Sequence, residues 1–205
     1  MENMYIMIIY LVFGITVCFG KIQNSVLNDD VQKYKGDYFG QKPPTSVPEI
    51  FLPEVFNQFG YVHGKVTFSP NRKEVFWVIT TIDRGKSIEK RLIIKQDENG
   101  VWGEPEESFM NTEFKENSPS FSHDGERIYY QSRSSLSDNG KLKDIDILYR
   151  EKEGNGWSEP MRLDAPVNSG KDDSQPWIAK DGSILFCREN DKYDSGFKGG
   201  SDIYY

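Results

Sequence analysis

The sequence predicts an all-β fold built from a repeated unit of four short antiparallel strands. Three observations predict it. Aromatic residues make up 14% of the 205 residues, and 18 Gly and 10 Pro accompany them, which is typical of short strands joined by tight turns. Hydrophobic residues reach only 37%, which is low for a helical core. Three sequence landmarks also recur in one order at a nearly constant period.

The first landmark is a strand, a tight turn and a second strand, found at residues 68–77, 121–130 and 178–187. The second is a Trp segment that ends in Glu-Pro, Gly-Val-Trp-Gly-Glu-Pro at 100–105 and Asn-Gly-Trp-Ser-Glu-Pro at 155–160. The third is a short apolar strand centred on Leu92, Ile147 and Ile203. Equivalent positions are 53 to 57 residues apart, so each unit occupies about 55 residues.

The second copy shows the expected strands most clearly. Asp124-Gly125 supplies the positive φ that a short hairpin turn needs. The first copy has Asn71-Arg72 at this point, so we expect a looser turn there. The second copy predicts, in order, a strand at 118–122, a turn at 123–126, strands at 127–132 and 146–151, a fourth strand at 157–163 and a connection at 164–174. Four antiparallel strands in about 55 residues match one blade of a β-propeller.

The pattern Phe-Ser-x-Asp-Gly-x-x-Ile-Tyr-Tyr, followed by Asp-Ile-x-Tyr and Gly-Trp-Ser-x-Pro-x-x-Leu, resembles the TolB-like (WD-like) β-propeller repeat of bacterial envelope proteins. The resemblance covers residues 59–205 and implies blades at about 59–116, 117–173 and 174–205. Residues 37–44 and 48–51 resemble the leader that precedes such propellers in some secreted members, so residues 21–58 are expected to form an extended leader.

The third blade is truncated, because the chain ends before its Gly-Trp strand. The chain therefore holds an incomplete propeller of about 2.5 blades, whereas closed propellers need at least about four. We expect a fragment of a protein of roughly 280–400 residues. Self-assembly of partial propellers is the alternative.

Residues 4–19 carry no charge and are short for a membrane span, which suits the apolar region of a secretory signal. Residues 1–20 are therefore predicted to be a signal peptide cut before Lys21. An uncleaved anchor and a lipidated Cys18 are the alternatives. Cleavage would leave no membrane span and one cysteine, Cys187, in the mature chain. The predicted location is exported: periplasmic, outer-membrane-associated or extracellular.

No catalytic or cofactor motif stands out. His-Glu-x-x-His, Cys-x-x-Cys and Gly-x-Ser-x-Gly patterns are all missing, so neither a cofactor nor a metal is expected. The two histidines, His63 and His123, lie at unequal points of the repeat and are read as exposed or packing residues. A net charge of −7 with no basic block argues against nucleic acid as a partner.

The long loops of the units are expected to form one polar face, and binding sites concentrate on such loops. These loops are placed at about 80–89, 107–117, 133–143, 164–175 and 188–200. The candidate binding residues on this face are Arg84, Arg133, Asp144, Asp172, Asp173 and Tyr193.

The sequence thus favours an exported, non-catalytic β-propeller module that binds an envelope protein or a glycan. One alternative is the propeller part of a secreted hydrolase, a peptidase or glycosidase, whose catalytic residues lie beyond Tyr205. Another is a structural accessory module next to a peptidoglycan-binding domain.

Overall fold

The computed structural model describes residues 34–43, 45–133, 144–189 and 201–205. The predicted signal peptide lies outside these residues. The chain divides into two compact units. The smaller comprises the described residues up to Ser46 together with Gln96–Glu104, and the larger comprises Val47–Lys95 with Pro105–Tyr205. Among the described residues, no helix has the length and apolar character needed to cross a membrane.

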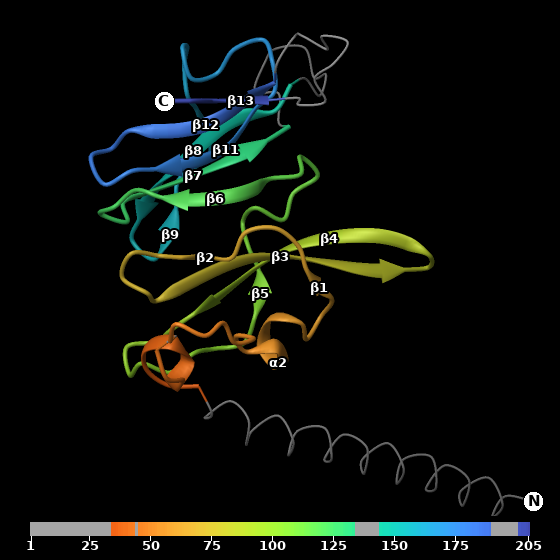
Figure 1. The fold of residues 1–205 in the computed structure, drawn as a ribbon, viewed down its shortest axis with the longest axis vertical. Helices are drawn as coiled ribbons and strands as arrows, with labels where there is room; N and C mark the ends of the chain where they lie inside the picture. Colours follow the sequence, from red (N-terminus) through yellow and green to blue (C-terminus); the bar gives the residue numbers. More distant parts are fainter. Residues whose placement is uncertain (1–33, 44, 134–143, 190–200) are drawn as a thin grey trace, which may run out of the picture. The chain divides into compact units, whose positions relative to one another are not determined.

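The larger unit is all-β, as predicted, and contains three antiparallel sheets (Figure 1). The first sheet contains β1 (Tyr61–Val62), β2 (Thr67–Phe68), β3 (Glu74–Asp83), β4 (Lys86–Lys95) and β5 (Glu106–Glu107). The second contains β6 (Asn117–Phe121), β7 (Arg127–Ser132), β8 (Asp146–Glu153), β9 (Gly156–Trp157) and β10 (Met161–Arg162). The third contains β11 (Asp173–Ile178), β12 (Ile184–Glu189) and β13 (Ser201–Tyr204).

In each sheet, strands that follow one another in the chain pair side by side, except β1 with β2 and β9 with β10. One edge strand is divided in each of the first two sheets. In the first sheet β1 and β2 both pair with β3, and in the second sheet β9 and β10 both pair with β8. The predicted fourth strand at 157–163 is therefore two short pieces, because the chain leaves the ladder between Trp157 and Met161.

The hairpin of β3 and β4 corrects the loop expected at 80–89. The two strands pair without interruption from Glu74↔Lys95 to Asp83↔Lys86, so the connection is a two-residue turn, Arg84-Gly85. Both turn residues have positive φ, 48° and 77°, which matches the twist of a two-residue hairpin. The polar residues at this end of the hairpin are exposed strand residues rather than a loop.

The first copy of the tight turn is not looser than the second. In the first copy, Asn71 Oδ1 accepts from the Ser69 hydroxyl at 2.7 Å and from the Lys73 amide at 3.0 Å. In the second copy, Asp124 Oδ1 accepts from the Ser122 hydroxyl at 2.6 Å and from the Glu126 amide at 3.0 Å. The expectation of a looser turn was wrong because the side-chain hydrogen bonds hold Arg72 in the left-handed region that a glycine would otherwise supply.

Buried apolar side chains fill the space between the first and second sheets. The cluster consists of Phe76, Ile93, Met110, Phe121, Ile128, Tyr130 and Leu148. The segment 47–58, within the predicted leader, also belongs to this larger unit. It contains the short helix α2 (Pro53–Phe56), where Phe56 meets the ring of Trp77 edge-on at 5.1 Å.

The smaller unit is organised around Trp102. Its ring stacks on Phe39 at 4.0 Å, and its indole N–H donates to the Gly36 carbonyl at 2.9 Å. Phe39 lies in the short helix η1 (Asp37–Gly40). The residues expected to form an extended leader thus include two short helical turns, η1 and α2. The Trp102 segment of the first copy therefore belongs to this smaller unit, and the last strand of the first sheet is β5.

Candidate functional site

The six predicted binding residues are spread over several elements. Arg84 is an exposed residue in the turn between β3 and β4. Arg133, just after β7, donates to Asp172 at 3.5 Å. Asp144 is half-buried before β8, and Tyr193 lies outside the described residues. Among the described members, Arg133 and Asp172 form an ion pair.

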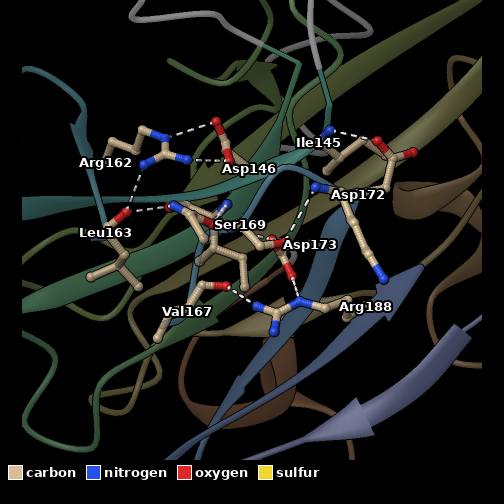
Figure 2. Close-up of polar contacts among 12 residues, drawn as sticks. Ile145, Asp146, Arg162, Leu163, Val167, Ser169, Asp172, Asp173 and Arg188 are labelled. Carbon is tan, nitrogen blue, oxygen red and sulfur yellow. Dashed lines mark hydrogen bonds and ion pairs between the residues drawn. The ribbon is translucent and has the colours of Figure 1, made fainter. Parts of the chain in front are cut away.

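Asp172 ends the connection from the second sheet to the third, and Asp173 is the first residue of β11 (Figure 2). Asp172 accepts from the Ile145 amide at 2.7 Å. Asp173 is fully buried, and its carboxylate accepts from the Ser169 amide and hydroxyl at 2.7 and 2.8 Å. It also accepts from Arg188 Nε at 2.6 Å. Asp173 therefore holds the connection together and does not face solvent as a binding residue.

Arg188 completes this buried network. Its second nitrogen donates to the carbonyls of Pro166 and Val167, at 2.8 and 2.9 Å. The guanidinium also lies over the rings of Phe186 and Tyr204. A charged group with so many fixed partners positions the start of β11 against β12, which is a structural role.

The connection from the first sheet to the second repeats this arrangement 57 residues earlier. Glu116, equivalent to Asp173, is 2% exposed and accepts from the Thr112 hydroxyl at 2.7 Å. Asn111, equivalent to Asn168, accepts from the Arg91 amide at 3.3 Å. The shared motif is an Asn, a hydroxyl residue, a buried acid and a Pro, at positions 111, 112, 116 and 119 and again at 168, 169, 173 and 176. It was not recognised from the sequence, although the equal spacing is visible there.

Burial perturbs two titratable groups next to the first connection. Burial raises the pKa of Glu116 above its ordinary value, although the Thr112 hydroxyl acts in the opposite direction. Burial also raises the pKa of Tyr130 to about 12, against the bond that its hydroxyl accepts from Arg150 at 3.1 Å. Arg150 lies over the Phe109 ring as well. These groups fill the joint between two sheets and are closed to a ligand.

A cleft of about 410 Å³ lies where the first strands of the three sheets end at their tight turns. Its walls come from β2, β6 and β11, from the segment just before β2, and from the turns after β2 and β6. The lining residues are Lys65, Val66, Thr67, Phe68, Pro70, Ser120, Phe121, Ser122, His123, Trp177 and Ile178. Phe68, Phe121 and Ile178 occupy equivalent positions of the repeat. The volume is within the range of small-molecule sites.

Hydrogen bonds between the strands give the cleft its shape. The Thr67 hydroxyl donates to the Pro119 carbonyl at 3.0 Å, which joins β2 to β6. The Ile178 amide donates to the Ser120 hydroxyl at 3.2 Å, which joins β11 to β6. Thr67 and Ser120 are equivalent positions, so the same place in the repeat makes both joints.

The cleft carries a cation and an exposed indole. Lys65 is exposed, yet desolvation around its ammonium lowers its pKa. Trp177 is 53% exposed, while Trp77 and Trp102 are each 1% exposed. Within the described chain no Asp or Glu lines this cleft. Sequence reasoning missed it because the three strands are more than 50 residues apart and meet only through packing between sheets.

Among the described residues, no group of three His, Cys, Asp or Glu side chains is arranged to hold a metal ion. The half-buried Cys187 is a free thiol on β12. His123 is an exposed residue of the second turn and lines the cleft, while His63 lies just after β1 and is not among the lining residues.

No protein-family model matches this chain, and no curated protein matches its sequence.

Proposed function

We propose that this protein is an exported, non-catalytic binding module of the bacterial envelope, built from β-propeller blades. The observation that carries the proposal is the cleft where the first strands of three successive repeat units meet. Propeller blades are antiparallel meanders whose first strands surround a central axis. The strand order within each sheet and the contacts of β2 and β11 with β6 are consistent with this architecture.

Export is proposed from the sequence at the N-terminus. An uncharged run at residues 4–19 followed by a strongly polar chain is the pattern of a secretory signal. The expected mature chain begins at Lys21. A binding partner of a propeller in this compartment would be an envelope protein or a glycan, as the resemblance to TolB-like repeats implies.

Fractionation of a bacterium that expresses the full chain tests export. The protein is expected in the periplasmic or outer-membrane fraction, with an intact mass that corresponds to loss of residues 1–20. A protein that retains residues 1–20 and stays in the cytoplasmic fraction would contradict the proposal.

Co-sedimentation tests the binding function. The mature chain is mixed with purified peptidoglycan sacculi and, separately, with outer-membrane fragments. We expect saturable binding to one of them, weakened by Trp177→Ala in the cleft and unaffected by Tyr61→Ala on β1, which is 75% exposed outside the cleft. Equal binding by the two variants and the parent protein would remove the cleft from the proposal.

A further inference from the structure

We propose that the cleft between β2, β6 and β11 binds a sugar that carries a carboxylate, with Lys65 contacting the carboxylate and Trp177 stacking on the sugar ring. This inference rests on the proposed binding function and adds the chemical class of the ligand. It depends on three features of the cleft: its charge, its exposed indole and the backbone of the strands that line it.

The charge of the cleft is opposite to that of the protein. The chain has 32 Asp and Glu against 25 Lys and Arg, yet the described residues that line the cleft include Lys65 and no acid. Within the described chain, the Lys65 side chain has no hydrogen-bond or ion-pair partner. An ammonium in partly desolvated surroundings gains from an anionic ligand, because charge-assisted hydrogen bonds are stronger away from bulk water.

Trp177 supplies the apolar surface. More than half of its side chain is open to solvent, which is unusual for a residue that occupies a strand position at the joint of two sheets. An exposed indole beside polar groups is a common means of binding a flat ligand that has one apolar face and one polar edge. The C–H face of a pyranose ring has that character.

The backbone argues against an extended acidic peptide as the occupant. A peptide that joins a sheet edge requires a row of free amide donors. Pro119 in β6 and Pro176 in β11 have none, and both residues are buried. The row of backbone amide donors along these strand edges is therefore interrupted. The side chains of Lys65, His123 and Trp177 remain as the ligand-binding groups.

The test measures binding of three probes to the mature chain by calorimetry and tryptophan fluorescence. The probes are a tri-galacturonate, a neutral tri-glucan of equal length and a hexaglutamate peptide. We expect the uronate to bind at least about tenfold more tightly than the neutral glucan, which corresponds to one charge-assisted hydrogen bond. Binding should change Trp177 fluorescence, because Trp177 is the most exposed of the four tryptophans.

Matched variants locate the site. Lys65→Met should weaken uronate binding about tenfold, while Lys65→Arg should keep it within a few-fold. Lys73→Met, a charge change at an exposed position outside the cleft, should have no effect. Trp177→Ala should weaken binding about tenfold and abolish the fluorescence change. Circular dichroism of each variant checks that the fold is kept.

The outcomes separate this inference from the proposed function. Equal binding of the uronate and the neutral glucan, with dependence on Trp177, would overturn the carboxylate assignment and leave the binding module standing. Binding of hexaglutamate alone would overturn the sugar assignment. No binding of any probe, together with no binding to sacculi or outer-membrane fragments, would overturn both.

Discussion

The connection from the first sheet to the second and the connection from the second to the third follow one plan with different electrostatics. Both place an Asn, a hydroxyl residue and a buried acid at equal spacing, and the hydroxyl donates to the acid in both. In the second connection the acid Asp173 forms an ion pair with Arg188 at 2.6 Å. In the first connection Arg91 donates instead to the backbone carbonyl of Glu116 and to the side chain of Glu89.

This difference shows that the two connections share a backbone geometry. The charged partner of the buried acid is not shared: it is an arginine side chain in the second connection only. The hydroxyl and the Asn side chain fix the turn of the chain, because they bond to positions that recur in each unit. The arginine is not part of the repeated plan, because Arg188 lies on β12 and Arg91 on β4, and Gln131 occupies the position equivalent to Arg188. One buried carboxylate is consequently neutralised by an ion pair, and the other retains a desolvation penalty that raises its pKa.

The largest expected effect comes from Asp173→Ala. This change leaves Arg188, whose side chain is only 16% exposed, without its carboxylate, and loss of one partner of such an ion pair typically costs about 3 kcal/mol of unfolding free energy. Urea unfolding of the variant measures the loss. Asp172→Ala is the neighbouring control, because Asp172 is only half-buried and its contact with Arg133 is 3.5 Å long. Equal losses in the two variants would contradict the role assigned to Asp173.

The next largest effect should come from removing the Asn side chains, and the loss of unfolding free energy should differ between the two connections. Asn168 makes three hydrogen bonds of 2.8 Å, two to Ile147 and one to Leu163. Asn168→Ala leaves the buried Ile147 amide without its acceptor, while the Ile147 carbonyl still accepts from the Leu163 amide, and should cost about 2 kcal/mol.

Asn111→Ala serves as the matched variant in the first connection and should cost about 1 kcal/mol or less, because its backbone bond to Arg91 is 3.3 Å long. Amide hydrogen exchange at Ile147 should accelerate in the Asn168 variant alone. Comparable losses in both variants would show that the two connections depend on their Asn residues equally.

The tight turns provide a smaller test. Gly125 has φ 80° and meets only ordinary contacts at the position of a Cβ, so Gly125→Ala should cost about 1 kcal/mol through backbone strain alone. Arg72→Gly should raise stability by about 0.5 kcal/mol, because it relieves a left-handed residue at φ 59°. Thermal unfolding of both variants measures the effects. A loss in Arg72→Gly would mean that the arginine side chain stabilises the turn.

The smallest expected effect concerns Glu116. Because burial raises its folded-state pKa above 4.5, ionisation costs stability as the pH rises through the folded pKa. Glu116→Gln cannot ionise, so its stability relative to the parent protein should be higher at pH 7 than at pH 4. Unfolding curves at the two pH values measure this difference. A relative loss at pH 7 would show that Arg91 and Arg150 stabilise the charged carboxylate more than burial disfavours it.

Local sequence was a good guide to the repeated turns and strands. The Ser-x-Asp-Gly segment contains its own hydrogen-bonding groups, so its structure follows from neighbouring residues. The hairpin of β3 and β4 was missed because Arg84-Gly85 is not a common two-residue turn and the flanking strand residues are polar. Polarity there reflects exposed strands, which a hydrophobic pattern cannot distinguish from a loop.

Asp173 shows why one predicted binding residue is instead structural. An acid in a polar connection is normally solvated, so it was expected to be exposed for binding. Its burial depends on Arg188, which lies 15 residues away on β12. The equivalent spacing of Glu116 and Asp173 was available in the sequence, and it would have indicated a structural role shared by two units.

The sequence alone determined the all-β class, the repeat of about 55 residues and the Asp124-Gly125 turn, because these depend on contacts between residues close along the chain. Tertiary structure decided which acids are buried, that Trp102 packs with Phe39, and that β2, β6 and β11 enclose a cleft with Lys65 and Trp177. Those outcomes depend on residues from different repeat units or distant segments, and no local pattern specifies how such surfaces pack.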